Sequence, residues 1–216
     1  GLLGPLRALR ETLATARWAA AGRPPPAPHA MKRRRVRALA RRHGCVLFVE
    51  TGTFEGDMVR AVLRDFERIY SIELGEALWK RARARFAGEP HVALLQGDSA
   101  RVLGEILPAI DRPCLFWLDG HYSAGETARA ERDTPILAEL AHIAAHPLGG
   151  RHVVLIDDAR LFTGSGDYPT LESIRAWARS AGYDGVTVVD DMIAVTPGPS
   201  GSAPSRLPSR APRPSR

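Results

Sequence analysis

Acidic residues follow the apolar segments that recur through the middle of this 216-residue chain. In chain order they are Glu50, Glu73, Asp98, Asp119 and the pair Asp157–Asp158. A single acid after a strand commonly caps a helix or a turn, but five such positions in succession are not well explained by capping. If the segments are parallel strands, their carboxyl ends share one edge of a sheet, where open α/β sheets bind ligands.

The first acidic segment runs into the sequence ETGTFEG, residues 50–56. Gly52 permits close approach of a ligand to the backbone, whereas a dinucleotide-binding loop would have a further glycine where Phe54 and Glu55 stand. The acids of this loop would repel a pyrophosphate. They suit a nucleoside that carries cationic groups, such as the ammonium and sulfonium of S-adenosylmethionine. Glu73 follows Gly52 by 21 residues, where a carboxylate can accept both ribose hydroxyls.

Asp119, Asp157 and Asp158 form a second group with possible chemistry. Neighbouring strands lie about 5 Å apart, so three carboxylates would converge on a small volume. Like charges that close need a cation or protonation, and an all-oxygen ligand set suits Mg²⁺. In the alternative interpretation, Asp119 faces the cofactor region and Asp157–Asp158 turns the chain. His121 is a candidate general base, because its ordinary pKa lies near neutrality; a structural role or support of a metal ligand remains open.

The spacing of the apolar segments predicts the elements that position these acids. The segments begin near Val46, Ile69, His91, Cys114, His152 and Val186. Helical stretches are expected over residues 56–66, 75–86, 99–110, 135–146 and 170–182. Strands that alternate with helices of this length are typical of βαβ units in a parallel sheet covered on both faces. The last apolar segment is interrupted only at Asp190–Asp191, which leaves room for an antiparallel hairpin and not for a helix.

Charge divides the chain into three parts. Residues 1–44 carry eleven Lys or Arg and one acid, residues 198–216 carry four Arg and no acid, and residues 45–197 carry 15 basic and 23 acidic residues. We therefore predict a helical, basic N-terminal extension (1–44, with helices over 2–18 and 31–42), a folded domain (45–197) and a disordered Pro/Ser/Arg tail (198–216). A fold that grips nucleic acid would carry its basic stripe on the domain itself, so nucleic acid is not the expected partner.

The remaining composition points to a soluble domain. No stretch approaches ~18 uninterrupted apolar residues, so no membrane span is expected. The chain starts without the basic and apolar regions of a secretory signal. Cys45 and Cys114 both lie in strand-like segments, which favours buried, reduced thiols and a cytoplasmic location.

The span from about Val46 to Pro197 resembles class I S-adenosylmethionine-dependent methyltransferases. ETGTFEG is similar to their first motif (acid-x-Gly-x-x-x-Gly), Glu73 stands where their ribose-binding acid lies, and residues 97–99 match the segment that contacts adenine. The resemblance implies an α/β, Rossmann-like, doubly wound sheet of seven strands in the order 3-2-1-4-5-7-6, with strand 7 antiparallel and helices on both faces. The cofactor-binding residues that it implies are Glu50, Thr51, Gly52, Thr53, Gly56, Glu73, Asp98, Ser99 and Asp119.

A finer resemblance concerns FWLDGH and LIDDA, which are similar to segments of the metal-dependent O-methyltransferases of the macrocin and catechol types. It implies a divalent cation, Mg²⁺, held by Asp119, Asp157 and Asp158, and a catalytic role for Asp119 and His121. In the macrocin type an acid stands where this chain has His121, and in the catechol type a lysine lies nearby. This departure leaves the role of His121 open.

These observations favour methyl transfer from S-adenosylmethionine to a hydroxyl of a small molecule. One alternative is a metal-independent enzyme that methylates a nitrogen or a carboxylate. Another is a protein that binds nucleic acid or a membrane surface through its basic ends, with residues 31–42 as its best support. The polar stretch 122–134 is either a loop that binds the acceptor or a solvated insertion. A homo-oligomer is compatible with the sequence, which does not identify the acceptor.

Overall fold

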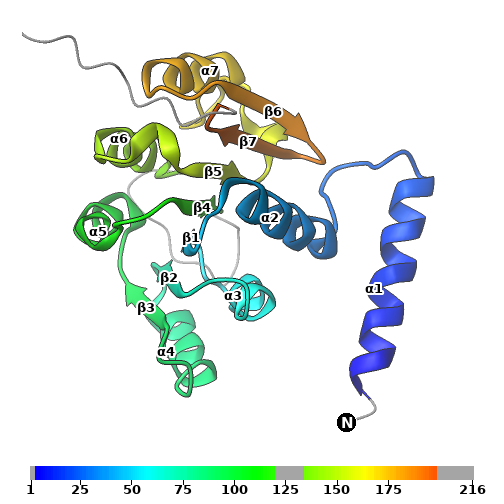
Figure 1. Ribbon diagram of the computed structural model, residues 1–216. Coiled ribbons are helices and arrows are strands. Elements are labelled where there is room, and N and C mark those ends of the chain that lie inside the picture. The colour runs from blue at the N-terminus through cyan, green and yellow to red at the C-terminus, as the bar shows by residue number, and fades with distance from the viewer. Residues whose placement is uncertain (1–2, 120–133, 199–216) are drawn as a thin grey trace, which may run out of the picture.

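The computed structural model describes residues 3–119 and 134–198 and contains one seven-stranded sheet (Figure 1). The strands are β1 (Leu47–Thr51), β2 (Arg68–Glu73), β3 (Val92–Gln96), β4 (Cys114–Leu118), β5 (Val153–Ile156), β6 (Gly185–Val189) and β7 (Met192–Thr196). Their order is β3-β2-β1-β4-β5-β7-β6. The first five strands pair in parallel, and β7 pairs antiparallel with β5 and β6. The predicted strand order and the antiparallel last strand are therefore confirmed.

The hairpin β6–β7 turns at Asp190 and Asp191, as the sequence predicts. Both residues have positive φ, 54° and 62°, and Val189 lies opposite Met192. Two successive residues of positive φ are typical of the tight turn that matches the twist of a two-stranded ribbon.

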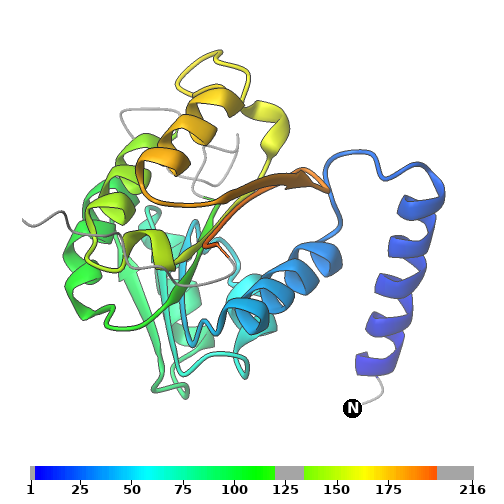
Figure 2. The same cartoon turned by 45° about the horizontal axis from the view of Figure 1, so that its top comes forward.

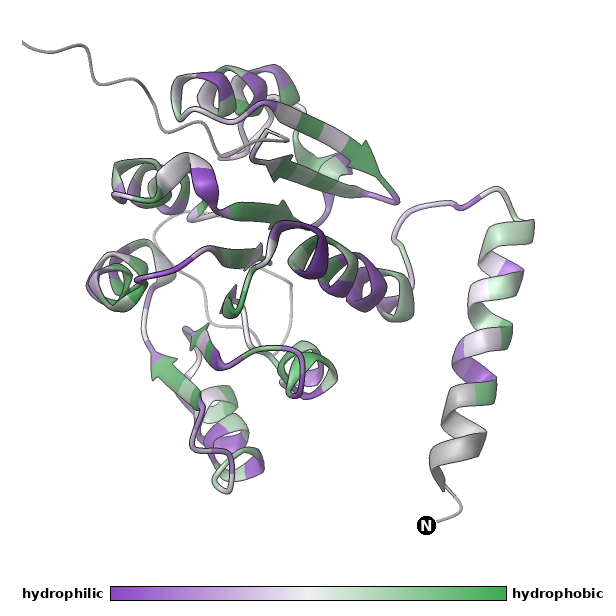
Figure 3. Cartoon of the chain, in the orientation of Figure 1, coloured by the Kyte–Doolittle hydropathy of each residue, from purple (hydrophilic) through white to green (hydrophobic). Residues whose placement is uncertain are grey.

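Helices other than α1 cover both faces of the sheet. The helices are α1 (Leu3–Ala20), α2 (His29–His43), α3 (Asp57–Val62), α4 (Glu76–Arg85), α5 (Ser99–Ile106), α6 (Ile136–Ala145) and α7 (Leu171–Ser180). One apolar cluster joins α5, α6 and α7 to one face, and a second joins α2 and α3 to the other (Figure 1). Alternate strand residues serve the two clusters: Leu47 and Val49 belong to the first, and Phe48 to the second. Apolar residues accordingly concentrate in the strands (Figure 3).

The two N-terminal helices differ in how they meet the sheet. The side chains of Val36, Leu39 and Ala40 on α2 are buried against the sheet in the second cluster. Helix α1 stands apart from the sheet (Figure 2), and its Leu9 and Leu13 are exposed. An ion pair between Arg33 and Glu11 joins α1 to α2.

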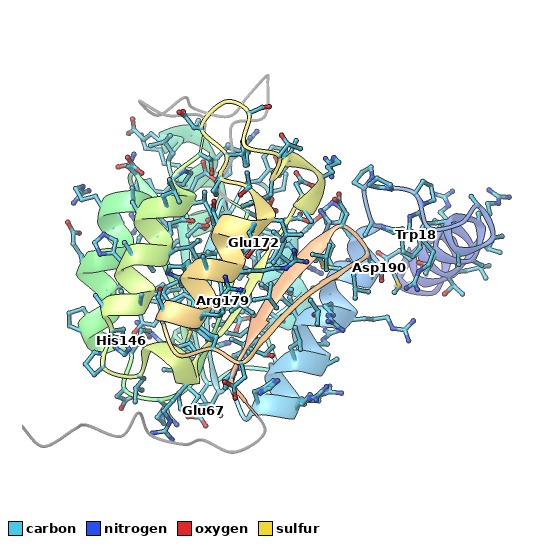
Figure 4. The ribbon with its side chains drawn as sticks, turned by 90° about the horizontal axis from the view of Figure 1, so that it is seen from above. Trp18, Glu67, His146, Glu172, Arg179 and Asp190 are labelled. Atoms are coloured by element: carbon cyan, nitrogen blue, oxygen red, sulfur yellow. The ribbon has the colours of Figure 1, made fainter. Side chains whose placement is uncertain are left out.

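The link between α1 and α2 is tied to the far end of the sheet. Arg23 donates a hydrogen bond of 2.7 Å to Asp190. Figure 4 shows Asp190 at the end of the hairpin that faces α1 and its Trp18. Among the described helices, none combines the length and the apolarity needed to cross a membrane.

The helix α3 is shorter than the predicted stretch 56–66. It ends at Val62, and Arg37 on α2 donates hydrogen bonds to the Ala61 carbonyl and to Asp65. These contacts satisfy polar groups at the end of α3 where the chain turns toward β2. Cys45 and Cys114 are buried free thiols, as predicted. The tail beyond residue 198, including its predicted disorder, lies outside the described residues.

Candidate functional site

Backbone hydrogen bonds join the carboxyl ends of the parallel strands into one edge. Gly97 N donates to Glu73 O, Gly52 N to Ile72 O, Asp119 N to Thr51 O and Asp157 N to Leu118 O, over 2.9–3.1 Å. The acids that follow the strands are thereby placed along a single edge. This is the arrangement that the sequence predicts.

The loop after β1 has a backbone that suits close approach of a ligand. Gly52, Phe54 and Gly56 have positive φ values of 83°, 47° and 72°. A side chain at Gly52 would be strained, because L-residues rarely adopt this conformation. A Cβ atom at Gly56 would lie 2.7 Å from the Phe86 ring, so both glycines are required by the fold of the loop.

Glu73 fixes the shape of this loop. Its Oε2 accepts a hydrogen bond of 2.8 Å from Phe54 N, and its Oε1 accepts one of 2.8 Å from Gly75 N. A carboxylate oxygen can accept more than one hydrogen bond, so acceptor capacity remains for a ligand. Glu73 therefore both organises the glycine loop and offers a carboxylate at the edge where a nucleoside would bind.

Glu50, which the sequence predicts to bind the cofactor, has a structural role beneath the loop. It is buried under the loop, where it accepts a hydrogen bond from Ser71, and Ser71 is in turn 2.6 Å from the Thr53 hydroxyl. Burial raises the pKa of Glu50 well above its ordinary value, and the charges of Asp119 and Glu73 add to this rise. Glu50 thus supports the loop from below.

Asp98 and Ser99 begin helix α5 at the next strand end. Asp98 Oδ1 accepts a hydrogen bond of 2.9 Å from Ala100 N, which makes it the N-cap of this helix. Glu139 on α6 is buried nearby, and burial raises its pKa to about 7. Glu139 is a second acid at this position, and the sequence analysis does not identify it.

Asp157 and Asp158 follow β5 directly, and each is paired with a basic residue. Asp157 Oδ2 accepts a hydrogen bond from Lys32 Nζ on α2, and Asp158 Oδ1 accepts one of 2.7 Å from Arg160. Burial raises the pKa of Asp157, although the Lys32 ammonium acts against this rise. Burial alone would lower the pKa of Lys32, but Asp157, Asp119 and Asp158 outweigh it and the pKa is raised. Lys32 is therefore charged at neutral pH.

Several buried polar atoms at this edge point to a ligand. Thr51 Oγ1, Glu139 Oε1 and Asp157 Oδ1 are buried and have no hydrogen-bond partner in the described part of the chain. Glu139 and Asp157 also line one small cavity, together with Leu118 and Tyr168. Buried polar groups are rarely left unpaired, so these atoms are candidates for contact with a bound molecule or ordered water.

The predicted magnesium site does not fit the arrangement of these acids. Asp157 and Asp158 are already neutralised by Lys32 and Arg160. Among residues 3–119 and 134–198, no group of three or more His, Cys, Asp or Glu side chains could hold a metal ion. The geometry therefore gives no support to Mg²⁺ at Asp119, Asp157 and Asp158.

The structure does not test every predicted site residue. His121 and most of the stretch 122–134 lie outside the described residues, so the predicted base and acceptor loop stay predictions. The sequence predicts Lys32 only as part of the basic helix over residues 31–42. A signal was present, since this chain has 30 Lys and Arg residues and only Lys32 and Lys80 are lysines.

Comparisons with known proteins identify the fold and do not extend to a family. No family model and no curated protein matches the chain. The SAH-bound methyltransferase PaMTH1 from Podospora anserina is similar over 76% of this chain and 77% of its own, with 16% identity and a TM-score of 0.52. An O-methyltransferase from Bacillus cereus, solved in complex with SAH, is similar over 82% and 86%, with 16% identity and a TM-score of 0.51. The chain thus has the Rossmann-like fold of these methyltransferases.

Proposed function

We propose that the protein is an S-adenosylmethionine-dependent methyltransferase that acts on a hydroxyl of a small molecule. The observation that carries this proposal is the joint geometry of the glycine loop and Glu73. Gly52 leaves the loop backbone without a side chain at a positive φ. The Glu73 carboxylate, which shapes the loop, can accept further hydrogen bonds at the same edge. A fold shared with methyltransferases supports the same class.

The chemistry depends on an electrophilic methyl group. Bound S-adenosylmethionine supplies it: the S–CH₃ bond breaks with its electron pair left on sulfur, as a new O–CH₃ bond forms. The chain's residues bind and orient: Glu73 for ribose hydroxyls, Asp98 and Ser99 for the adenine, and the acidic loop for the cationic part of the molecule. Holding two reactants in line can lower the activation free energy by ~7–11 kcal/mol. The acceptor proton passes to a base, for which His121 remains the candidate.

A metal-independent enzyme is a second candidate, and one observation favours it over the metal-dependent form. Lys32 already places a positive charge on Asp157. A nitrogen or carboxylate acceptor would suit such an enzyme as well as a hydroxyl, so the acceptor atom is open to experiment. The small-molecule acceptor and a homo-oligomeric state are likewise proposals.

Calorimetric titration with S-adenosylhomocysteine tests the proposal, first with Mg²⁺ and then with EDTA. We expect saturable one-site binding of equal strength in both buffers. Binding only with Mg²⁺ would favour the metal-dependent form. Absence of binding in either buffer would contradict the methyltransferase assignment, and NAD⁺ provides the control for a general nucleotide site.

A further inference from the structure

Lys32 occupies an unusual position for a lysine in a basic helix. It lies on α2 directly before three arginines, Arg33 to Arg35, yet only 9% of its surface is accessible. Its ammonium donates a hydrogen bond to Asp157, a residue 125 positions later in the chain. Burying a lysine is costly unless its charge is matched, so the position requires the acids around it.

The packing of α2 holds this ammonium in place. Val36, one turn after Lys32, has no exposed surface, and Leu39 is almost completely buried in the same cluster. The Lys32 side chain leaves this anchored helix toward the carboxyl edge of the sheet, where Asp157 ends β5. Its location is therefore set by the core and not by a mobile surface segment.

Protein cations already pair with acids at this edge. Asp157, Asp119 and Asp158 all act electrostatically on Lys32, and Arg160 pairs with Asp158 and with Asp191. Three carboxylates that the sequence assigned to a divalent cation thus meet two protein cations. A metal ion would have to approach a fixed ammonium, which costs more than the approach to an unpaired acid.

From this geometry we infer that Lys32 is the resident cation of the acid cluster and takes the place of a divalent metal ion. The inference rests on the proposed function, in which it makes Lys32 a positioning residue: its fixed charge orients Asp157 and stabilises negative charge that develops at this edge. Removing the ammonium takes the cation away from Asp157, and the acid cluster should then attract a divalent ion more strongly.

A titration with Mn²⁺ tests this inference. The loss of the EPR signal of the free ion measures how much Mn²⁺ is bound. The proteins compared are the full chain, Lys32→Met and the control Lys80→Met, which removes the other lysine from an exposed pair with Glu76. We expect weak or no binding by the full chain and by Lys80→Met. Lys32→Met should bind Mn²⁺ about tenfold more tightly or better, because it loses a like charge at close range.

Two results would overturn the inference. The first is equal Mn²⁺ affinity in the full chain and in Lys32→Met, and the second is absence of Mn²⁺ binding in all three proteins. If Lys32→Met does not fold, Lys32→Gln replaces it, and Asp157→Asn in the Lys32→Met background should restore the melting temperature. If Asp157→Asn does not restore the melting temperature, the result would also contradict the role assigned to the Lys32–Asp157 ion pair.

A parallel titration of the same samples with S-adenosylhomocysteine separates this inference from the proposed function. Cofactor binding without any change in Mn²⁺ binding would reject the role of Lys32 alone. A gain of Mn²⁺ binding without cofactor binding would support the resident cation and reject the proposed function.

Discussion

The Glu73 carboxylate shapes the glycine loop, and in the proposed function it also binds the ribose. It accepts backbone hydrogen bonds from two loops, from Phe54 N after β1 and from Gly75 N after β2. Because these bonds fix the conformation of the loop, loss of the carboxylate should remove the proposed ribose contact and also release the backbone beside it. The two effects act on binding in the same direction.

Glu73→Ala should weaken binding of S-adenosylhomocysteine by about 1.5–3 kcal/mol, as expected for a lost hydrogen bond to a charged group. Calorimetry measures the change. Glu76→Ala, on the exposed first turn of α4, is the control and should bind as the full chain does. If Glu73→Ala retains full affinity, Glu73 does not belong to the site.

Glu139 gives the protein a pH-dependent stability. Its pKa is raised by burial from 4.5 to about 7. The native state therefore keeps a proton that the unfolded chain has lost, and the free energy of unfolding falls as the pH rises from about 4.5 to about 7. The effect is ~3 kcal/mol at most, from 1.36 kcal/mol per pKa unit.

Glu139→Gln should remove this part of the pH dependence. The melting temperature of the variant, relative to that of the full chain, should rise as the pH is raised from 5 to 8. The difference between the two curves of melting temperature against pH isolates Glu139 from other titrating groups. Parallel curves would show that Glu139 is ionised in the native state at low pH.

At the scale of elements, α1 and α2 divide the basic N-terminal segment into two different parts. The side of α2 that faces the sheet is apolar, and its Leu39 is buried between the helix and the strands. Leu13 on α1 is 49% exposed. A helix that fills the core contributes to folding, whereas exposed leucines contribute little.

This difference predicts unequal effects of one and the same substitution. Leu39→Ala should lower the free energy of unfolding by about 2–5 kcal/mol, because it leaves a cavity in the core. Leu13→Ala should change it by less than ~0.5 kcal/mol. Chemical denaturation of both variants checks the pair, and similar losses would mean that α1 packs as firmly as α2.

The elements themselves were largely predictable from the sequence. Apolar segments with regular spacing predicted strand starts within one residue, such as Leu47 for Val46 and Val153 for His152. Acids at the strand ends predicted the edge that carries Glu73 and Asp98. Lys32 was not predictable in the same way, because its partner is set by how α2 packs and not by local sequence. The same holds for Glu139, which reaches the site from α6.

At the scale of the whole molecule, most of the excess basic charge lies outside the domain that carries the candidate site. The domain over residues 45–197 has 23 acidic and 15 basic residues, and the basic excess lies in the two ends of the chain. Arginines of α2 are partly used within the fold, as Arg37 is with Asp65. Any attraction to a polyanion therefore depends mainly on the terminal segments, whereas the cofactor site depends on the sheet edge.

Removal of residues 1–22 together with 199–216 should separate these two properties. The truncated chain keeps α2 and all seven strands, so its affinity for S-adenosylhomocysteine should equal that of the full chain. Its binding to a short single-stranded RNA should weaken, and the salt dependence of RNA binding should become shallower because fewer phosphate contacts release counterions. Fluorescence anisotropy at two salt concentrations measures this. The truncated chain still carries the basic helix α2, so undiminished RNA binding would assign the RNA contacts to α2 or to the domain and would favour a nucleic-acid acceptor over a small molecule.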